Sequence, residues 1–377
     1  MPDATADLLA DLVAIDSVNP SLVQGGAGEA AIAAHVAAWA RAAGLQTEVL
    51  EATPGRPSVV VRAPGRGGGR SLLLCGHLDT VGLEGMTEPL TPRIDGDRLH
   101  GRGAYDMKAG VAAALVACRE AAALDLAGDV IVAAVADEEH ASLGVQEVLA
   151  GLHADAAIVT EPTELEVVVA HKGFVWAEIE VAGRAAHGSR PHLGVDAIVK
   201  SGPILTAIGA LDESLAARTH PLDGRGSVHA SVIRGGEELS SYPARCVLGL
   251  ERRTLPGESA ADVEAELATL LDRCREADPE LEAAQRTLLV REPFEAPDGA
   301  AIVDTVCAAA AEVIGAAPQI AGASYWADAA FIAAAAIPTV MFGPAGAGAH
   351  AAEEWVSLAS TETVARTLVA VAARVCS

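Results

Sequence analysis

The chain has 377 residues, 51% of them apolar, which is enough to bury a large core and to form two or three domains. Acidic residues outnumber basic ones by 51 to 26, and the formal net charge of -25 excludes nucleic acid and anionic membranes as expected partners. No window approaches the roughly 18 apolar residues of a transmembrane helix, and the acidic N-terminus does not read as a signal peptide. Six scattered cysteines without a CxxC pair are typical of reduced thiols, so we expect a cytoplasmic protein.

Helical and strand patterns alternate along the first 172 residues and again near the C-terminus. Helices are predicted at 3–15, 28–43, 108–124 and 361–375, and strands at 57–63, 71–76, 129–136, 154–160 and 337–343. This alternation predicts an α/β fold with a mostly parallel sheet that helices cover on both faces.

The segment between these two stretches has a different pattern. It reads as strand, helix, two strands, helix and strand, with the first helix expected to bend or break at Gly202-Pro203. This β-α-β-β-α-β order is that of a small ferredoxin-like α+β domain. We therefore predict a discontinuous catalytic domain, 1–172 and 291–377, with an inserted domain at 173–290.

Acidic and imidazole side chains follow three of the predicted strands directly. His77 ends one strand, Glu138 and Glu139 follow the next, and Glu161 follows a third. Ligand sites in open α/β sheets lie at this carboxyl edge. Several buried carboxylates need a metal ion or a basic partner, and no cluster of Lys or Arg occurs in these segments. The pattern therefore favours a metal site.

Adjacent side chains diverge, so Glu138 and Glu139 are expected to have different tasks. One can bind a metal, and the other can take a proton from water as a general base. The pair also fits a solvated acidic loop. Asp79, in His77-Leu78-Asp79, can hold the second ring nitrogen of His77, although a polar loop gives the same pattern.

Two further candidates lie in glycine-rich segments. Asp106, in HGRGAYDMKAG, is either a helix cap for 108–124 or a carboxylate that bridges two cations. His350, in GPAGAGAHAAEEW, is either a surface residue or a ligand, and Glu353 and Glu354 are expected to face solvent or to support the site. His187 lies in the inserted domain and is not an obvious ligand within one chain.

Seven motifs in order resemble the co-catalytic zinc family of aminoacylases, which includes acetylornithine deacetylase, succinyl-diaminopimelate desuccinylase and glutamate-releasing carboxypeptidases. They are LLLCGHLDTV, HGRGAYDMKAG, VADEEHASLG, IVTEPTEL, AAHGSRPHLGVDAI, ERRTLPGE and GAGAH. The resemblance covers nearly the whole chain. It implies two zinc ions, for which cobalt can substitute, and a homodimer joined through the inserted lid and dimerisation domain.

The resemblance also implies a role for each site residue. His77 and Glu161 would hold one ion, Glu139 and His350 the other, and Asp106 would bridge them, with a cis peptide bond to Met107. Asp79 would orient His77, and Glu138 would be the general base. His187 would reach the partner subunit's site and polarise the scissile carbonyl. Arg253, or its neighbour Arg252, would bind the substrate carboxylate.

The implied function is hydrolysis of an N-acyl amino acid, as by an acetylornithine deacetylase. A dipeptidase, a carboxypeptidase or a succinyl-diaminopimelate desuccinylase are alternatives within the same family. The chain departs from the family pattern at Ser240, where many relatives have Asn, and at Ala327, where many have Thr or Ser. A doubly wound binding or redox protein and a serine hydrolase are disfavoured, because neither GxGxxG nor GxSxG occurs in the required context.

Overall fold

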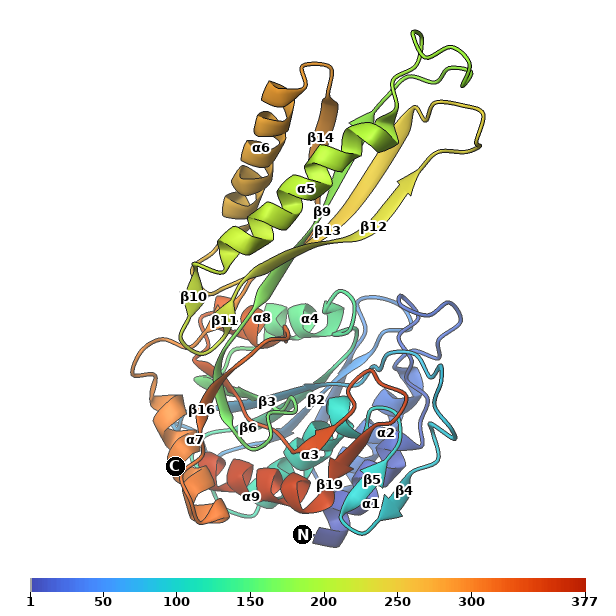
Figure 1. Cartoon of the computed structure of the whole chain (residues 1–377). Helices are drawn as coiled ribbons and strands as arrows, with labels where there is room; N and C mark the ends of the chain where they lie inside the picture. The colour runs from blue at the N-terminus through green and yellow to red at the C-terminus, as the bar shows by residue number, and fades with distance from the viewer. Residues whose placement is uncertain (1) are drawn as a thin grey trace. The chain divides into compact units, whose positions relative to one another are not determined.

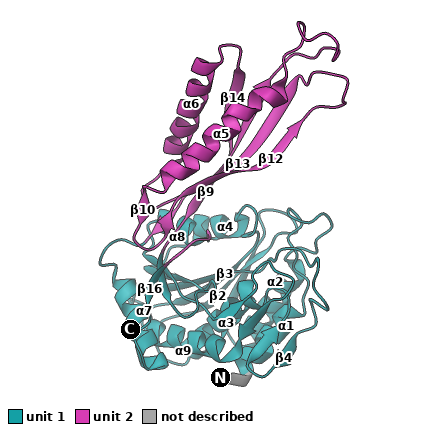
Figure 2. Ribbon diagram, viewed as in Figure 1, with its two compact units in different colours: residues 1–169, 296–321, 327–377 teal, residues 170–295, 322–326 magenta. Residues whose placement is uncertain are grey.

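The computed structural model describes residues 2–377, which divide into two compact units (Figures 1 and 2). The first unit runs to Val169 and also takes in Ala296–Ala321 and Ala327–Ser377, and the second consists of Ala170–Glu295 and Gly322–Trp326. The predicted insert, 173–290, lies inside the second unit. The short segment 322–326 joins that unit although it follows far later in the chain.

The largest sheet has a parallel centre. Its strand order is β1-β2-β6-β3-β7-β17-β8-β15, and β16 pairs with β8. The central pairs β6–β3, β3–β7 and β7–β17 are parallel, and the pairs β1–β2, β2–β6, β17–β8 and β8–β15 are antiparallel. The strands are β1 (Gln46–Leu50), β2 (Ser58–Ala63), β3 (Leu72–His77), β6 (Val130–Val135), β7 (Ala156–Val159), β8 (Val167–His171), β15 (Phe294–Glu295), β16 (Ile320–Ala323) and β17 (Thr339–Met341). The prediction of a mixed α/β fold with a mainly parallel central sheet is confirmed.

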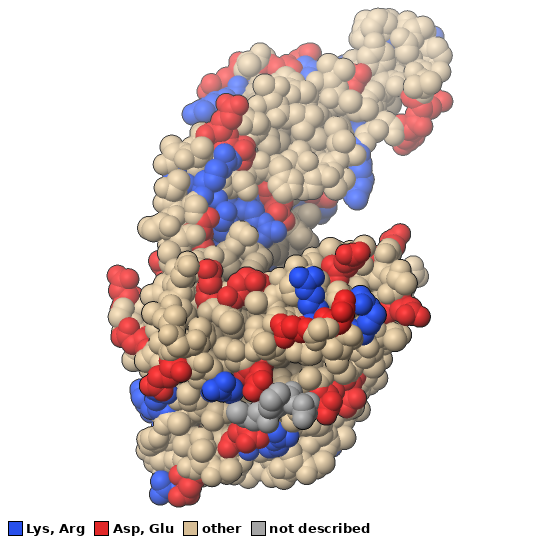
Figure 3. Space-filling view, turned by 60° about the horizontal axis from the view of Figure 1, so that its bottom comes forward, with Lys and Arg blue, Asp and Glu red and all other residues tan. Residues whose placement is uncertain are grey.

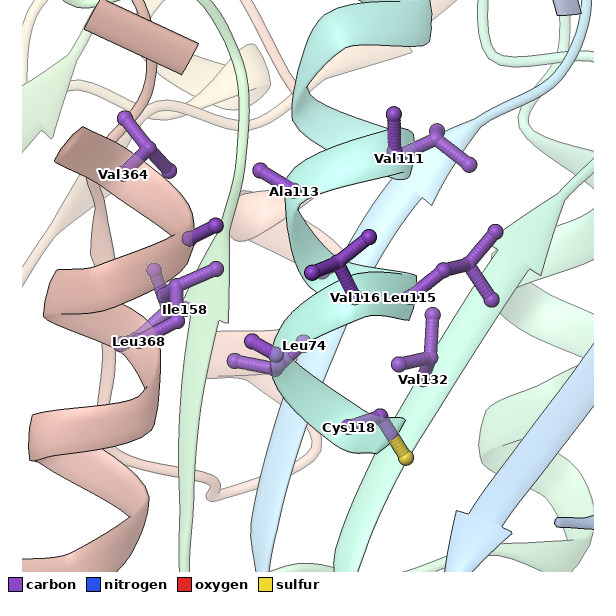
Figure 4. Packing of buried hydrophobic residues seen from close by; sticks show 14 of the residues in the cluster. Leu74, Val111, Ala113, Leu115, Val116, Cys118, Val132, Ile158, Val364 and Leu368 are labelled. Carbon is purple, nitrogen blue, oxygen red and sulfur yellow. The ribbon is translucent and has the colours of Figure 1, made fainter. Parts of the chain in front are cut away.

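Helices cover both faces of this sheet (Figure 1). One face carries α1 (Pro2–Val13), α2 (Ala30–Ala42), α3 (Ala109–Ala121), α7 (Ala301–Ile314) and α9 (Leu358–Val375), and the other carries α4 (Leu143–Gly151) and α8 (Ala329–Ala334). The central helix α3 is rich in alanine and almost wholly buried, so it packs closely between the sheet and α9. Figure 4 shows Leu74, Val132 and Ile158 of the sheet beside α3, with Val364 and Leu368 of α9 next to them.

A second, small sheet joins two loops that are distant in sequence. It has the order β18-β19-β5-β4, with β4 (Arg93–Asp95), β5 (Arg98–His100), β18 (Gly346–Ala347) and β19 (Trp355–Ser357). The sequence did not predict these strands, because elements of two or three residues are too short for a periodic pattern. They bring the segment around His350 beside the one that leads to Asp106.

The second unit is a four-stranded antiparallel sheet with two helices on one face (Figure 1). The strand order is β12-β13-β9-β14, and the elements are β9 (Gly173–Ala182), α5 (Ala197–Leu215), β10 (Thr219–His220), β11 (Gly224–Arg225), β12 (Ser227–Gly235), β13 (Arg245–Thr254), α6 (Ala260–Ala277) and β14 (Glu282–Arg291). The helix expected to bend or break at Gly202-Pro203 does not break, because α5 is continuous through Pro203. Pro203 and Val199, whose carbonyl oxygen loses its helical partner at Pro203, are both exposed, while the buried Ile204 and Ile208 anchor the helix.

The surface carries mixed charge in spite of the net value of -25. On the face drawn in Figure 3, acidic side chains are scattered and Lys and Arg side chains lie beside many of them. None of the described helices combines the length and apolar character that crossing a bilayer requires.

Candidate metal centre

All five predicted ligands and Glu138 come together in the first unit. His77 is the last residue of β3, Glu138 and Glu139 lie in the turn after β6, and Glu161 follows β7. Because β6, β3 and β7 are adjacent and parallel, their carboxyl ends meet at one edge. Asp106 reaches this edge from the irregular turn before α3, and His350 reaches it from the loop between β18 and β19.

The donor atoms are spaced as ligands of shared cations. His77 Nε2 lies 3.2 Å from Asp106 Oδ1 and 3.8 Å from Glu161 Oε1. His350 Nε2 lies 3.2 Å from Asp106 Oδ2 and 3.1 Å from Glu139 Oε2. Ligands that bind one tetrahedral ion at about 2.0–2.2 Å are about 3.3–3.6 Å apart, close to these separations. Asp106 thus turns one oxygen toward each imidazole, which is the arrangement of a bridging carboxylate.

The electrostatics of the site also call for positive charge. Burial and the neighbouring carboxylates raise the pKa of Glu138, Glu139 and Glu161. Hydrogen bonds to Asp106 and Glu139 raise the pKa of His350 to about 10. Burial lowers the pKa of His77, but Asp106 and the surrounding carboxylates raise it well above its usual range. In the protein without metal, the protonated imidazoles therefore provide the positive charge that bound cations would otherwise provide. The carboxylate and imidazole donors fit divalent metal ions.

Asp79 supports the centre in a different way from the one predicted. His77 Nδ1 bonds the main-chain oxygen of Asp79 at 2.9 Å, and the Asp79 carboxylate lies farther away, at 3.6 Å. That carboxylate instead accepts the backbone N–H groups of Glu138, at 3.1 Å, and Glu139, at 3.2 Å. Asp79 thus fixes the tautomer of His77 through its backbone and holds the acidic turn through its side chain.

The turn that carries Asp106 does not use this residue as a helix cap. Lys108 is the residue that precedes α3, and the Asp106–Met107 peptide bond is cis, as the family resemblance implies. Lys108 Nζ donates to the carbonyl oxygens of Leu12 and Ile15, which anchors the turn to the end of α1.

Two further buried acidic groups support the centre: Glu354, which was expected either to face solvent or to support the site, and Asp137, to which the sequence assigned no role. Glu354 is only 1% exposed and accepts the backbone N–H groups of Gly103, Tyr105 and Asp106. Its partner Arg102 donates to it at 2.7 Å. The other group, Asp137, belongs to a buried network that begins in the N-terminal segment. The position of Glu354, four residues after His350, was a signal, but its burial was not visible in the sequence.

The remaining predicted residues belong to the second unit. His187 is exposed, and its Nδ1 lies 2.8 Å from Ser189 Oγ. Arg253 bonds Glu251 through Nε at 2.8 Å, and its guanidinium lies over the ring of Phe174.

The structure also gives the burial of the two residues that depart from the family pattern and of the alternative arginine. Ser240 is exposed and Ala327 is fully buried. Arg252 is buried in ion pairs with Glu258 and Glu266, so Arg253 is the better candidate for a substrate contact.

Comparison with known proteins gives consistent matches over most of the chain. Residues 73–374 match the model of peptidase family M20/M25/M40. Acetylornithine deacetylase of Photorhabdus laumondii is 30% identical over 289 residues, which cover 73% of this chain and 71% of the relative.

Solved structures share the fold at lower identity. Aminopeptidase PepT of Bacillus cereus has a TM-score of 0.79 at 20% identity, with 100% of this chain and 99% of that chain covered. A Bacillus subtilis protein described as a dinuclear metal binding peptidase of the M20 family has a TM-score of 0.76 at 14% identity, with coverage of 100% and 98%.

Proposed function

Because this chain belongs to peptidase family M20/M25/M40 and is therefore a hydrolase of amide bonds, we propose that it removes the acyl group from an N-acyl amino acid. The observation that carries the proposal is the placement of Asp106 between two imidazoles, with Glu138 at the same edge of the sheet. The match to acetylornithine deacetylases supports an acyl amino acid as substrate.

The proposed centre holds two zinc ions, for which cobalt can substitute. His77 and Glu161 would hold one ion, Glu139 and His350 would hold the other, and Asp106 would be a ligand of both. Such ions polarise an amide carbonyl and lower the pKa of water toward about 7. After Asp106 and Glu161, Glu138 is the third carboxylate near His77 Nε2, at 3.9 Å, but it is not needed to complete either ligand pair.

Glu138 is proposed as the general base. It takes a proton from the attacking water and delivers it to the leaving amine. Burial and neighbouring carboxylates raise its pKa, which suits a group that must both accept and return a proton near neutral pH. The N–H groups of Glu138 and Glu139 bond the same Asp79 carboxylate, so this anchor sets where the base stands relative to the ligand.

The second unit supplies the proposed substrate contacts. Arg253 binds the substrate carboxylate through its two terminal nitrogens, because its Nε already bonds Glu251. His187 polarises the scissile carbonyl of the partner subunit's substrate, which requires a homodimer joined through the second unit as lid and dimerisation domain. The six cysteines, free in the described chain, agree with a cytoplasmic location.

A dipeptidase or carboxypeptidase is the alternative, because solved structures of this fold include an aminopeptidase and a metallo-carboxypeptidase. A succinyl-diaminopimelate desuccinylase is a further alternative within the family. The metal centre is compatible with each of these activities, so the substrate pocket has to distinguish them.

The test is a panel of N-acetyl and N-succinyl amino acids, dipeptides and carboxy-blocked peptides, assayed with added zinc or cobalt. We expect N-acyl amino acids to be the best substrates. The Glu138→Gln variant should lower kcat by about 10²–10⁴-fold while retaining its metal. Full activity of that variant, or turnover of no member of the panel, would contradict the proposal.

A further inference from the structure

A buried polar network lies beneath the acidic turn Asp137–Glu139 and begins outside the region that the family model matches. Its members Asn19, Glu29 and Arg56 precede residue 73, where that match starts. Asn19 and Glu29 are fully buried, and Arg56 is 7% exposed. Because a charged group is rarely buried without a structural or functional reason, the contacts of this network need an explanation.

Arg56 is the cation of the network. Its Nε donates to Glu29 Oε2 at 2.7 Å, and its Nη2 donates to both Glu29 Oε1 and Asp137 Oδ1 at 2.7 Å. The backbone N–H of Asp137 also donates to Glu29 Oε1, at 3.2 Å. One guanidinium thus joins α2, where Glu29 precedes the first turn, to the first residue of the acidic turn.

Asn19 continues the network to the catalytic residues. Its side-chain amide donates to Asp137 Oδ1 at 3.0 Å and to Asp79 Oδ2 at 2.8 Å. The Asp79 carboxylate in turn accepts the N–H groups of Glu138 and Glu139. A continuous chain of hydrogen bonds, buried as far as Asp79, therefore connects Arg56 to the backbone of the proposed base and of one proposed ligand.

The turn itself needs this support. Asp137 has φ of 70°, a left-handed conformation that residues other than glycine adopt reluctantly. Without Arg56, the buried carboxylate of Glu29 would lose its arginine partner, and Asp137 would keep only the imidazole of His140, whose Nδ1 lies 4.0 Å from Asp137 Oδ1. Repulsion between the two carboxylates would push Asp137, and the two glutamates that follow it, away from their present positions.

We propose that Arg56 is a positioning residue, which sets the location of Glu138 and Glu139 through Glu29, Asp137, Asn19 and Asp79. The proposal rests on the proposed function for its effect on catalysis. Its structural part concerns only the order of the turn and can be tested without metal or substrate.

The test compares Arg56→Met and Arg56→Lys with a matched control, Arg62→Met. Arg62 lies on β2, is about one-third exposed and pairs with Asp129, away from the metal centre. In the metal-free full chain, hydrogen–deuterium exchange of peptides covering residues 136–142 should be about tenfold faster in Arg56→Met. Peptides from α9 should be unchanged. Arg56→Lys keeps the charge but loses the forked contact, so it should be intermediate.

Metal binding gives the second readout. Competition with a chromophoric chelator should show zinc affinity about 10–100-fold weaker in Arg56→Met, as for other partners of ligands. With a substrate from the panel, kcat should fall with little change in KM. Arg62→Met should match the wild type throughout.

The two readouts separate failure of the proposal from failure of the proposed function. Wild-type exchange at 136–142 in a folded Arg56→Met protein would overturn the positioning role. Equal effects of Arg62→Met would also overturn it, because they would indicate general destabilisation. If Arg56→Met does not fold, wild-type exchange and zinc affinity in Arg56→Lys would be the overturning result. A wild type that binds no zinc would contradict the proposed function, and the exchange comparison would still decide the role of Arg56.

Discussion

Replacing Glu354 with glutamine should test how much the residue that supports Asp106 contributes to stability, because it changes none of the proposed metal ligands. The carboxylate accepts four hydrogen bonds: Oε2 accepts from Arg102 and Gly103, and Oε1 accepts from Tyr105 and Asp106. A glutamine has one oxygen and one amide nitrogen at these places. In either orientation of the amide, two buried donors face another donor.

The magnitude follows from these contacts. Each hydrogen bond to a charged group contributes about 1.5–3 kcal/mol, so two lost bonds amount to about 3–6 kcal/mol. Breaking a buried ion pair by neutralising one partner costs about 3–5 kcal/mol, which agrees. We therefore expect Glu354→Gln to lower the free energy of unfolding by about 3–5 kcal/mol, a large part of the 5–15 kcal/mol typical of a folded protein.

The assay is urea unfolding of the metal-free chain, monitored by circular dichroism. Glu353→Gln is the matched control, because its side chain is the exposed neighbour on the same loop and should change stability by less than about 0.5 kcal/mol. Zinc affinity should also fall in Glu354→Gln only. Equal unfolding midpoints for the two variants would refute the reasoning, since the chemical change is the same and only the buried contacts differ.

Three other outcomes are expected. Chelating the metal should lower the melting temperature and abolish activity, and zinc at about 100 times its Kd should restore about 2.7 kcal/mol; a melting temperature unaffected by zinc would contradict a shared cation site. Arg253→Lys should raise KM about tenfold or more for substrates with a free carboxylate and not for their amides, because lysine lacks the planar fork; an equal rise for both would argue against a carboxylate contact. Burial raises the pKa of Asp223 to about 6, so the native state loses stability as pH rises from about 4 through 6. Asp223→Asn should therefore stabilise the protein relative to wild type near pH 8 but not near pH 4, and urea titrations at both pH values check this sign.

Helices and strands could be predicted from the sequence where apolar residues follow a regular pattern along the chain. Strands β3 and β6 are buried at every position and read as near-continuous apolar runs, because helices cover both faces of the sheet. The small sheet that holds the loop of His350 was missed, because its pairing depends on contacts between distant segments. Of the predicted bend or break in α5, the break is wrong. Packing of its buried face outweighs the local effect of an exposed Pro203.

The site was predictable where it follows from topology. Parallel neighbours must end at one edge, so residues at or just beyond the carboxyl ends of β3, β6 and β7 had to meet. The supporting residues were not predictable by this rule, because Asn19 and Asp137 are 118 positions apart and lie in no common motif. The resemblance suggested that Asp79 orients His77, but only coordinates could show that its backbone oxygen makes that bond.

The placement of the arginines leaves the proposed ligand carboxylates without a fixed cation. Arg56 neutralises Glu29 and Asp137, and Arg102 neutralises Glu354, so both guanidinium groups serve supporting carboxylates. The ligand carboxylates make their ion pairs, among the described residues, with the imidazoles of His77 and His350. A lysine or arginine among the proposed ligands would neutralise the negative charge of their carboxylates permanently and would compete with a divalent ion. Arg56 and Arg102 thus pair with the supporting carboxylates, which leaves the negative charge of the proposed ligands to their imidazoles or to a divalent ion.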